Sequence, residues 1–406
     1  MVSHVPPLPR TSGQRQRVYH MLRAARERFH VTFAGLASSR VPEEARAGLA
    51  ELADAALLLP SRYAASSASK AWHRMAGTLF ALRKGVKLSN YVIGELEFAP
   101  SRLAEATAGL EFDCVLLEYW HASGIADHFR ARGIPCVLDL HDVVWRARER
   151  ELAGSRLPAW WRERSLERYR TAEERAWERF DGLVAINRDE EAYVRERVAG
   201  RARVFWAPMG IDLAAWTFAP APATPPRIAF YGGLSSGPNR AGAARLVRDV
   251  MPAVWRRFPD AECWLVGSDP APELRSLARD PRVRVPGFVE RAPELLRTMS
   301  VVACPWEGRY GFRSRLIEVM ALGVPVVVSP DAISGMELVA GEGVMVGRDD
   351  AGLAARLADL LGDRDLAARQ GLAARATVER SFGLDATYRR LFGELAGWLD
   401  EGGGAS

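Results

Sequence analysis

The stretch Cys304–Ser329, CPWEGRYGFRSRLIEVMALGVPVVVS, has the pattern of a loop, a helix and a buried strand. Its first part is rich in glycine and arginine, and an apolar helix with the single acid Glu318 follows. Gly323 and Pro325 end the helix, and the apolar run Val324–Val328 is typical of a parallel strand covered on both faces. A basic loop that leads directly into a helix N-terminus predicts an anion site.

The composition fits a globular chain of two ordinary domains, with 406 residues of which 48% are hydrophobic. No apolar run reaches the roughly 20 residues that cross a membrane, and the N-terminal stretch lacks the apolar segment of a secretory signal. We therefore expect a cytoplasmic protein. The four cysteines stand singly in apolar runs without metal-type spacing, which predicts reduced thiols. The net charge of +5 favours anionic partners such as nucleotides, phosphates or anionic lipid.

The first half of the chain alternates short apolar strands with helical segments, which is typical of a parallel sheet. Gly13 lies in a proline-rich loop before a helix, where a missing side chain lets a ligand approach the backbone. His141 stands in the motif Asp139–Asp142 (DLHD) at the C-terminal end of a strand, the edge where open α/β sheets bind ligands. The predicted strands lie at 31–36, 55–59, 114–118, 136–140, 182–186 and 204–207.

Two helical segments of this half carry unusual surfaces. The basic segment Arg62–Lys87 contains Trp72 and Phe80, and both a contact with an anionic membrane and an ordinary solvated helix face remain open. The segment Trp145–Phe180 is highly charged and predicts one exposed helix or a pair of helices. A lipid or acceptor contact there is also open.

The second half begins after a proline-rich linker and again alternates strands and helices. We predict an N-terminal domain over 1–207, a linker over 208–226 and a C-terminal domain over 227–384. A helix over 385–400 is expected to pack back toward the N-terminal domain. The fold class is α/β, with two doubly wound Rossmann-like domains facing across a cleft.

Several nucleotide-binding patterns are absent from the sequence. The glycines Gly232, Gly233 and Gly237 follow a strand but do not form the dinucleotide fingerprint, and no P-loop motif occurs. The acids Asp363 and Asp365 lie between two helices, where capping explains them better than metal binding. No nucleic-acid-binding module is recognisable, so the basic charge does not indicate nucleic acid.

The segment Tyr310–Val327 (YGFRSRLIEVMALGVPVV) resembles the E-G-F-G-L-P-x-x-E-A-M-A-x-G-x-P-V-V segment of the family 4 glycosyltransferases, which have the GT-B fold. Other matches follow in the order of that family and extend the resemblance over nearly the whole chain. They are DLHD at 139–142, PMGID at 208–212, FYGG at 230–233 and GFV at 287–289.

The sequence differs from the family pattern at the first glutamate and at the basic pair. The first of the two family glutamates falls on Tyr310, and the usual basic pair after the strand at 227–231 is replaced by Gly233 and Asn239. Arg240 is a partial substitute for that pair. The loop is more similar to a branch with the pattern G-x-R-x-K-x-x-E, which Arg313, Arg315 and Glu318 fit.

The resemblance implies a retaining bacterial hexosyltransferase that needs neither a metal ion nor a cofactor. It would move a sugar from a nucleotide-diphospho-sugar to an acceptor hydroxyl in the synthesis of a glycan, an exopolysaccharide or a natural-product glycoside. His141, Arg313 and Arg315 are implied as catalytic residues, with both arginines on the diphosphate. The implied donor-binding residues are Gly13, Gly232, Gly233, Arg240, Phe288, Gly311, Phe312, Leu316 and Glu318, whose carboxylate would hold the ribose.

The acceptor and some alternatives stay open. A lipid-linked glycan, another glycan or a small molecule could accept the sugar, and the protein could bind peripherally to the inner face of an anionic membrane. A GT-B pseudoenzyme or binding scaffold is one alternative, favoured by the loss of the first glutamate. A nucleotide-sugar epimerase or phosphorylase on the same fold is another, although seven histidines are few for an epimerase.

Overall fold

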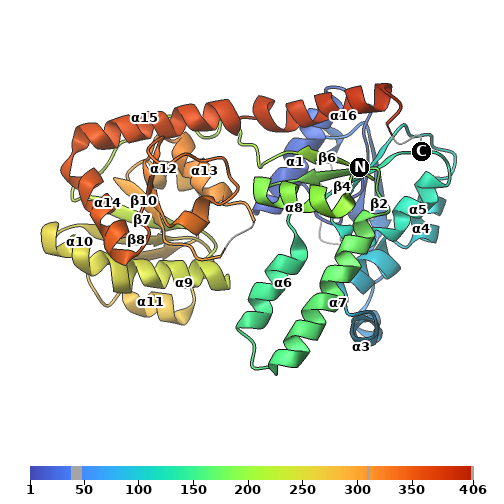
Figure 1. Cartoon of the computed structure of the whole chain (residues 1–406), viewed down its shortest axis with the longest axis horizontal. Helices are drawn as coiled ribbons and strands as arrows, with labels where there is room; N and C mark the ends of the chain where they lie inside the picture. Colours follow the sequence, from blue (N-terminus) through green and yellow to red (C-terminus); the bar gives the residue numbers. More distant parts are fainter. Residues whose placement is uncertain (38–47, 309–310, 404–406) are drawn as a thin grey trace. The chain divides into compact units, whose positions relative to one another are not determined.

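The computed structural model describes residues 1–37, 48–308 and 311–403 and divides into two compact units (Figure 1). Unit 1 consists of Met1–Pro208 together with Thr387–Ser406, and unit 2 of Met209–Ala386. Each unit is built on parallel strands with helices between them, so the predicted α/β class is confirmed. Residues 38–47, and also Tyr310, lie outside the described residues.

Unit 1 holds a two-stranded and a four-stranded parallel sheet, ordered β2-β1 and β3-β4-β5-β6. Val2 joins them, because it forms bridges to Ala34 of β1 and Leu117 of β3. All of these pairings are parallel, so the C-terminal ends of the strands share one edge. The strands are β1 (Thr32–Ala37), β2 (Ala55–Pro60), β3 (Val115–Glu118), β4 (Cys136–Asp139), β5 (Gly182–Ala185) and β6 (Arg203–Trp206).

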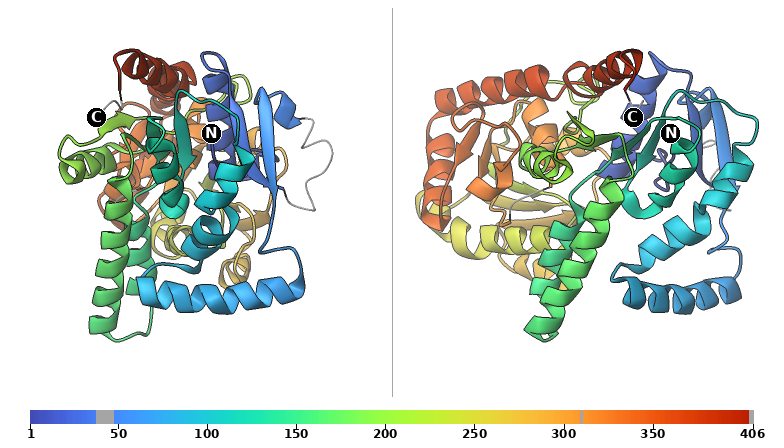
Figure 2. Two further views of the ribbon diagram at one scale, coloured as in Figure 1. Left: turned by 90° about the vertical axis from the view of Figure 1, so that its right-hand side faces the viewer. Right: turned by 45° about the vertical axis from the view of Figure 1, so that its right-hand side comes forward.

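The helices of unit 1 are α1 (Gly13–Arg26), α3 (Ser67–Lys84), α4 (Pro100–Ala106), α5 (Gly124–Arg130), α6 (Val144–Ala153), α7 (Ala159–Trp177), α8 (Arg188–Val198) and α16 (Arg390–Asp400). A π-helical segment covers Asn90–Glu97, and a short 3₁₀ turn covers Trp120–Ala122. The region predicted over 145–180 is the pair α6 and α7. Helix α3 and the far end of this pair project on the side of unit 1 opposite α16 (Figure 2).

Unit 2 contains one six-stranded parallel sheet with the order β12-β11-β10-β7-β8-β9. From β7 the chain adds β8 and β9 on one side of the sheet, and it then adds β10, β11 and β12 on the other side. The direction in which strands are added therefore reverses between β7 and β10. Ligands of such sheets bind at this switch point, beyond the C-terminal ends of the strands. The strands are β7 (Arg227–Tyr231), β8 (Glu262–Val266), β9 (Val283–Gly287), β10 (Val301–Cys304), β11 (Val326–Val328) and β12 (Val344–Val346).

Side chains that alternate along the strands of unit 2 build a core on each face of the sheet. In β11, Val326 and Val328 join one buried cluster and Val327 joins the other. All three are fully buried, which confirms the prediction of a strand covered on both faces. The covering helices are α9 (Gly237–Arg245), α10 (Met251–Arg257), α11 (Pro272–Leu277), α12 (Ala292–Leu296), α13 (Ser314–Ala321), α14 (Asp350–Gly362) and α15 (Arg364–Ser381).

Some boundaries differ from those predicted, for local reasons. From the sequence we place the start of the helix after β7 at 241, but it begins at Gly237, because the Ser236 hydroxyl accepts a hydrogen bond from the backbone of Asn239 and caps it. Asp363 caps α15 by accepting a bond from the Leu366 backbone nitrogen at 2.8 Å, as its capping interpretation predicts. All four cysteines are free thiols. Within the described ranges, no helix combines the length and apolar character of a membrane span.

Candidate functional site

The anion site predicted from Cys304–Ser329 lies at the switch point of the unit 2 sheet. The loop after β10 leads into α13, and the loop after the neighbouring strand β7 starts at Gly232. Arg315 in the first turn of α13 reaches the end of β7, where its Nη1 donates to the Tyr231 hydroxyl oxygen at 3.0 Å. A side-chain hydrogen bond therefore links the start of α13 to the end of β7 at the switch point.

Arg315 also forms an ion pair with Glu318 on the same face of α13. Its Nη1 lies 2.8 Å and 2.6 Å from the two carboxylate oxygens, and Glu318 is only 2% exposed. Burial alone would lower the pKa of Arg315, but the negative charge of Glu318 outweighs it and holds the pKa above its usual range. Burial, together with the charge of Glu318, raises the pKa of Tyr231 as well. Arg315 thus stays cationic and Tyr231 stays neutral near pH 7.

Arg313 has a different environment from Arg315. Its Nη1 donates to the Gly311 carbonyl at 2.7 Å, and its Nη2 donates to the Gly308 carbonyl at 2.8 Å. The guanidinium also lies over the Trp306 ring, 4.5 Å from the centroid, and the residue is buried. These contacts make Arg313 a brace for the loop that precedes α13.

The loop after β7 is held close to the sheet by backbone contacts. A Cβ atom on Gly267, which has φ +152°, would lie 1.7 Å from the Gly232 carbonyl oxygen, so only glycine fits this approach. The Asn239 amide donates to the Gly233 carbonyl at 2.9 Å and fixes the loop from the α9 side. A Cβ atom on Gly233 would meet nothing within 4 Å. The backbone at Gly233 therefore faces open space.

The remaining predicted residues of unit 2 divide into exposed and buried groups. Phe288 follows β9 and is 72% exposed, whereas Leu316 is buried and Phe312 packs partly buried against the Phe382 ring. Arg240 in α9 pairs with Glu273 at 3.0 Å on the surface. Gly311 has φ +79° and forms the turn before α13. The structure thus joins Arg315 and Glu318 directly, while Arg240 is engaged elsewhere.

A second charged cluster lies at the C-terminal edge of the unit 1 sheet. Glu118 and Asp139 end the adjacent strands β3 and β4 and are register partners. His141 follows β4, and its Nε2 forms a hydrogen bond with the Glu118 carboxylate and lies 3.4 Å from Asp139 Oδ2. All three residues are buried. The predicted His141 is therefore part of a buried cluster with two acids.

Arg17 of α1 completes this cluster, although no sequence pattern indicates it. Its Nε and Nη2 donate to both oxygens of Asp139 at 2.7 Å, and its Nη1 donates to the Ala207 carbonyl at 2.9 Å. Burial alone would raise the pKa of Asp139, but the charges of Arg17 and His141 hold it below its usual range. Burial raises the pKa of Glu118 against the opposing effect of His141. The predicted Gly13 is the first residue of the same helix α1.

Backbone conformation and ring stacking restrict how His141 is presented. His141 has φ +57° and Tyr119 has φ +65°, both in the left-handed region that bulky residues rarely adopt. Their rings stack with centroids 4.1 Å apart. Positive φ in non-glycine residues marks positions that the surrounding structure holds under strain, often at functional sites.

The Glu118, Asp139 and His141 group has the residue types of a metal site, and its candidate ligand atoms lie within 4.8 Å of one another. The bidentate Arg17 already supplies a positive charge to Asp139, so a cation would compete with a buried guanidinium. The donor set therefore fits a histidine held between acids better than a metal centre.

The positions of Glu118 and Asp139 could have been recognised from the sequence. The strands CVLLE and CVLDL each place an acid at or near their C-terminal end, and adjacent parallel strands bring such ends together. Tyr231 likewise ends its strand. Arg17 carries no such signal, because its partner Asp139 is 122 positions away.

The chain has clear relatives among proteins of known sequence and structure. Residues 225–363 match the model of the family described as Glycosyl transferases group 1. A segment of 180 residues is 35% identical to phosphatidyl-myo-inositol mannosyltransferase of Mycolicibacterium smegmatis, and it covers 42% of this chain and 45% of that protein. The chain thus matches about half the length of this curated relative.

Solved structures resemble the fold over its full length. Sucrose-phosphate synthase from Thermosynechococcus elongatus is similar with a TM-score of 0.70 and 18% identity, covering 99% of this chain and 98% of that one. HepE from Anabaena, in complex with UDP and glucose, is similar with a TM-score of 0.65 and 15% identity, covering 98% of each chain. These likenesses place the chain in the GT-B class of glycosyltransferase folds.

The sequence resemblance to this class is confirmed, and the family match lies over the unit that carries Arg315 and Glu318. Residues 225–363, the segment that carries Arg315 and Glu318, are thus similar to the group 1 glycosyl transferases.

Proposed function

We propose that this protein is a retaining glycosyltransferase that moves a sugar from a nucleotide-diphospho-sugar to an acceptor hydroxyl. The observation that carries the proposal is the contact of Arg315 with both Glu318 and Tyr231 at the N-terminal turn of α13. The cation and the helix N-terminus suit the diphosphate of a nucleoside diphosphate, and the buried carboxylate suits its ribose hydroxyls.

The diphosphate would bind at the loop before α13. As the bond between the sugar C1 and the phosphate oxygen breaks, negative charge develops on the leaving phosphate. The Arg315 guanidinium supplies fixed donors for that charge, which is why we propose that the reaction needs no metal ion. The acceptor oxygen forms the new bond to C1 on the same face, and the acceptor proton passes to the leaving phosphate.

Glu318 would accept hydrogen bonds from the ribose hydroxyls of the donor. Its carboxylate now receives the Arg315 guanidinium, so donor binding would exchange part of this pair for ribose contacts. The freed donors of Arg315 would then turn to the diphosphate. Arg313 would support this exchange by holding the Gly308 and Gly311 carbonyls.

The proposal also gives ligand contacts to two residues of unit 1, His141 and Gly13. His141 would touch the donor sugar, and Gly13 would allow the diphosphate or the acceptor to approach the start of α1. The Glu118 carboxylate holds the His141 ring on one side, and Tyr119 stacks on it. A ring fixed in this way keeps one orientation toward a sugar hydroxyl.

The relatives indicate which substrates to test first. The solved HepE complex contains UDP and glucose, and the mycobacterial relative is named for a lipid inositol acceptor. We therefore propose a UDP-hexose donor and an acceptor carried on a lipid, in bacterial glycan synthesis at the inner face of the membrane. Glycans and small natural products remain alternative acceptors.

The test combines donor binding with turnover. UDP-, GDP-, dTDP- and ADP-sugars are screened by thermal shift, and release of nucleoside diphosphate is measured for each donor that stabilises the protein. The proposal expects slow donor hydrolysis without an acceptor, and an α-linked product from an α-linked donor would establish retention.

A binding scaffold is the second candidate, because Arg313 is engaged with backbone carbonyls and the first family glutamate is replaced by Tyr310. Donor binding without release of nucleoside diphosphate, with any acceptor class, would favour the scaffold. An epimerase would instead change the configuration of the released sugar, which NMR of the products detects.

A further inference from the structure

Helix α3 of unit 1 carries an apolar stripe that faces solvent. Gly77 is its only buried residue within the described chain, and the Gly77 side of the helix packs against Leu88 and Tyr91. Of the eleven large hydrophobic residues exposed in the described chain, four lie on this one helix. These four are Trp72 (61% exposed), Met75 (54%), Leu79 (64%) and Leu82 (61%).

The spacing of these four residues places them on one face of the helix, over roughly 15 Å of its length. A surface helix of a globular protein normally turns such a stripe toward the core. Here the stripe is exposed and needs an apolar partner outside unit 1.

The charged residues of the segment that carries the stripe are all basic. The segment 61–94 contains six lysines and arginines and no acidic residue. The whole chain has only three lysines, and all three (Lys70, Lys84 and Lys87) lie in this segment. A cluster of this kind in an otherwise arginine-rich sequence provides a compact positive surface.

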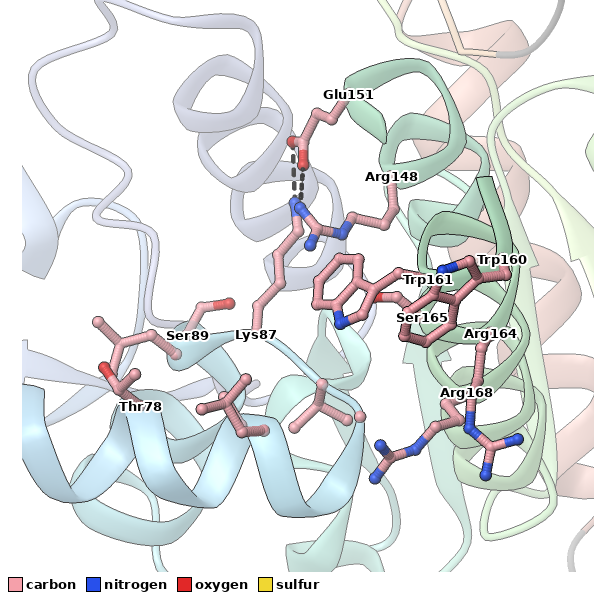
Figure 3. Close-up of a pocket in the computed structure, with 15 residues that line it drawn as sticks. Thr78, Lys87, Ser89, Arg148, Glu151, Trp160, Trp161, Arg164, Ser165 and Arg168 are labelled. Atoms are coloured by element: carbon pink, nitrogen blue, oxygen red, sulfur yellow. Dashed lines mark hydrogen bonds and ion pairs between the residues drawn. The ribbon is translucent and has the colours of Figure 1, made fainter. Parts of the chain in front are cut away.

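A groove of about 780 Å³ lies between α3 and the pair α6–α7, beside the stripe (Figure 3). Trp160 and Trp161 form one wall, and Trp160 is 67% exposed. Glu151 pairs with Lys87 at 2.9 Å and with Arg148 at 3.0 Å, so this end of the groove keeps an excess positive charge.

Two further arginines lie at the other end of the groove. Arg164 and Arg168 are exposed, and neither has an acidic partner among the residues that the structure describes. Arg168 donates to the Arg83 carbonyl, which ties α7 to the C-terminal end of α3. The groove therefore joins the exposed Trp160 ring to two guanidinium groups that have no acidic partner in the described part of the chain.

We infer that the α3 stripe and this groove form one docking surface for a bilayer that contains anionic phospholipid. An apolar face flanked by lysine and arginine is the pattern of a helix that lies in the membrane interface. Tryptophan prefers the headgroup level, where Trp72 and Trp160 would sit, and the guanidinium groups would pair with lipid phosphates.

Other occupants fit the surface less well. An acidic peptide in the groove would cover Leu82 and Trp160 but leave Trp72, Met75 and Leu79 exposed, because these do not line the groove. A second copy of this chain would bring two basic surfaces together, which repel each other.

The role of this docking surface rests on the proposed function, because membrane binding would bring the transferase to an acceptor carried on a lipid. The test does not depend on turnover. The full chain is sedimented with vesicles of phosphatidylcholine containing about one-third phosphatidylglycerol, and with vesicles of phosphatidylcholine alone. We expect binding only to the anionic vesicles, weakened when salt rises from about 0.1 M to about 0.5 M.

Two pairs of variants with matched controls test the surface. Leu79→Glu/Leu82→Glu should abolish vesicle binding, whereas Leu372→Glu on α15, where the leucine is 59% exposed, should leave it unchanged. Arg164→Gln/Arg168→Gln should weaken binding about fivefold per arginine removed, whereas the exposed pair Arg275→Gln/Arg279→Gln should have no effect. Circular dichroism and donor hydrolysis check that each variant is folded.

The outcomes separate this inference from the proposed function. Equal binding to both kinds of vesicle, no binding at all, or binding that survives the α3 substitutions would overturn the docking surface, even if donor hydrolysis is normal. Self-association that the α3 substitutions abolish, without vesicle binding, would overturn it in favour of a dimer. Vesicle binding by a protein that hydrolyses no donor would support the docking surface and contradict the proposed transferase function.

Discussion

Arg315 Nη1 lies within hydrogen-bonding distance of both carboxylate oxygens of Glu318, at 2.8 Å and 2.6 Å, one turn further along α13. The two residues are three positions apart, so the helix itself sets their geometry. The pair does not depend on a distant element for its assembly, and the sequence pattern R-x-x-E already contains it. The ion pair thereby fixes the position of the buried Glu318 carboxylate.

Replacing Arg315 with alanine should lower the rate of donor turnover by about 10²–10³-fold, because a fixed donor to the leaving phosphate is lost. Arg315→Lys should retain part of the activity, since the charge remains but the planar set of donors is lost. Nucleoside diphosphate release gives both rates. Turnover of Arg315→Ala within threefold of the parent would contradict the assigned role.

Glu318→Gln should weaken donor binding more than it slows turnover, because the proposed partner of Glu318 is the ribose and not the reacting bond. We expect a rise in KM of about tenfold, which corresponds to the loss of one charge-assisted hydrogen bond. Steady-state kinetics over a range of donor concentrations separate the two parameters. A fall in kcat with an unchanged KM would instead place Glu318 at the reacting centre.

The buried ion pair of Arg17 with Asp139 should be important for the stability of unit 1. Arg17→Met leaves the Asp139 carboxylate buried without its main partner, and we expect a loss of about 3–5 kcal/mol. Urea unfolding followed by tryptophan fluorescence measures this loss. The double variant Arg17→Met/Asp139→Leu should recover part of it, because no unpaired charge remains.

Stability should fall between pH 7 and pH 5 because of two partly buried histidines. Burial, with the nearby charges of His121 and His141, lowers the pKa of His4 to about 3, and burial, with Lys87, lowers the pKa of His121 to about 4. An unfolded histidine titrates near 6.5, so below that pH the unfolded state binds protons that the folded state does not. The stabilisation is present above pH 6.5 and is lost as the pH falls toward these values.

Thermal unfolding at a series of pH values tests this dependence, which we expect to amount to roughly 1–3 kcal/mol between pH 7 and pH 5. The combined substitution His4→Gln/His121→Gln should flatten the curve in this range. His30→Gln serves as the control, since the His30 side chain is 79% exposed. An unchanged slope in the double variant would refute the assignment.

Two glycines of the switch point should respond differently to alanine. Gly267→Ala forces a Cβ atom into the Gly232 carbonyl and should lower the melting temperature strongly or prevent folding. Gly233→Ala meets open space, so the fold should survive while donor affinity falls if the diphosphate passes over this backbone. Melting temperature and donor affinity are measured for both variants.

The parts of the fold that depend on local pattern could be predicted from the sequence. The apolar run 324–328 indicates β11, and Gly323 ends α13 before it with φ +79°. Glycine and proline between 154 and 158 mark the break between α6 and α7, although charge pattern alone left one or two helices open.

The parts that depend on tertiary contacts could not be predicted. Arg17 looks like one of many arginines on an amphipathic helix, and only the packing of α1 against the sheet buries it beside Asp139. Arg313 and Arg315 look equivalent in sequence, yet the turn at Gly311 directs one to backbone carbonyls and the other to Glu318. The sequence identifies the charged groups of the candidate site but not their partners.

Unit 1 is made from two pieces of chain, and this has a consequence for the order of events on the ribosome. Tyr388 is fully buried, with its ring 5.7 Å from the Arg17 guanidinium carbon, and the Trp398 ring lies 5.8 Å from that of Phe205. These contacts cannot form until residues after 386 have been synthesised. Unit 2 is continuous and is completed earlier, so the unit whose synthesis begins first is the last to close, and a chain stalled near residue 386 would present an open unit 1 to chaperones and proteases.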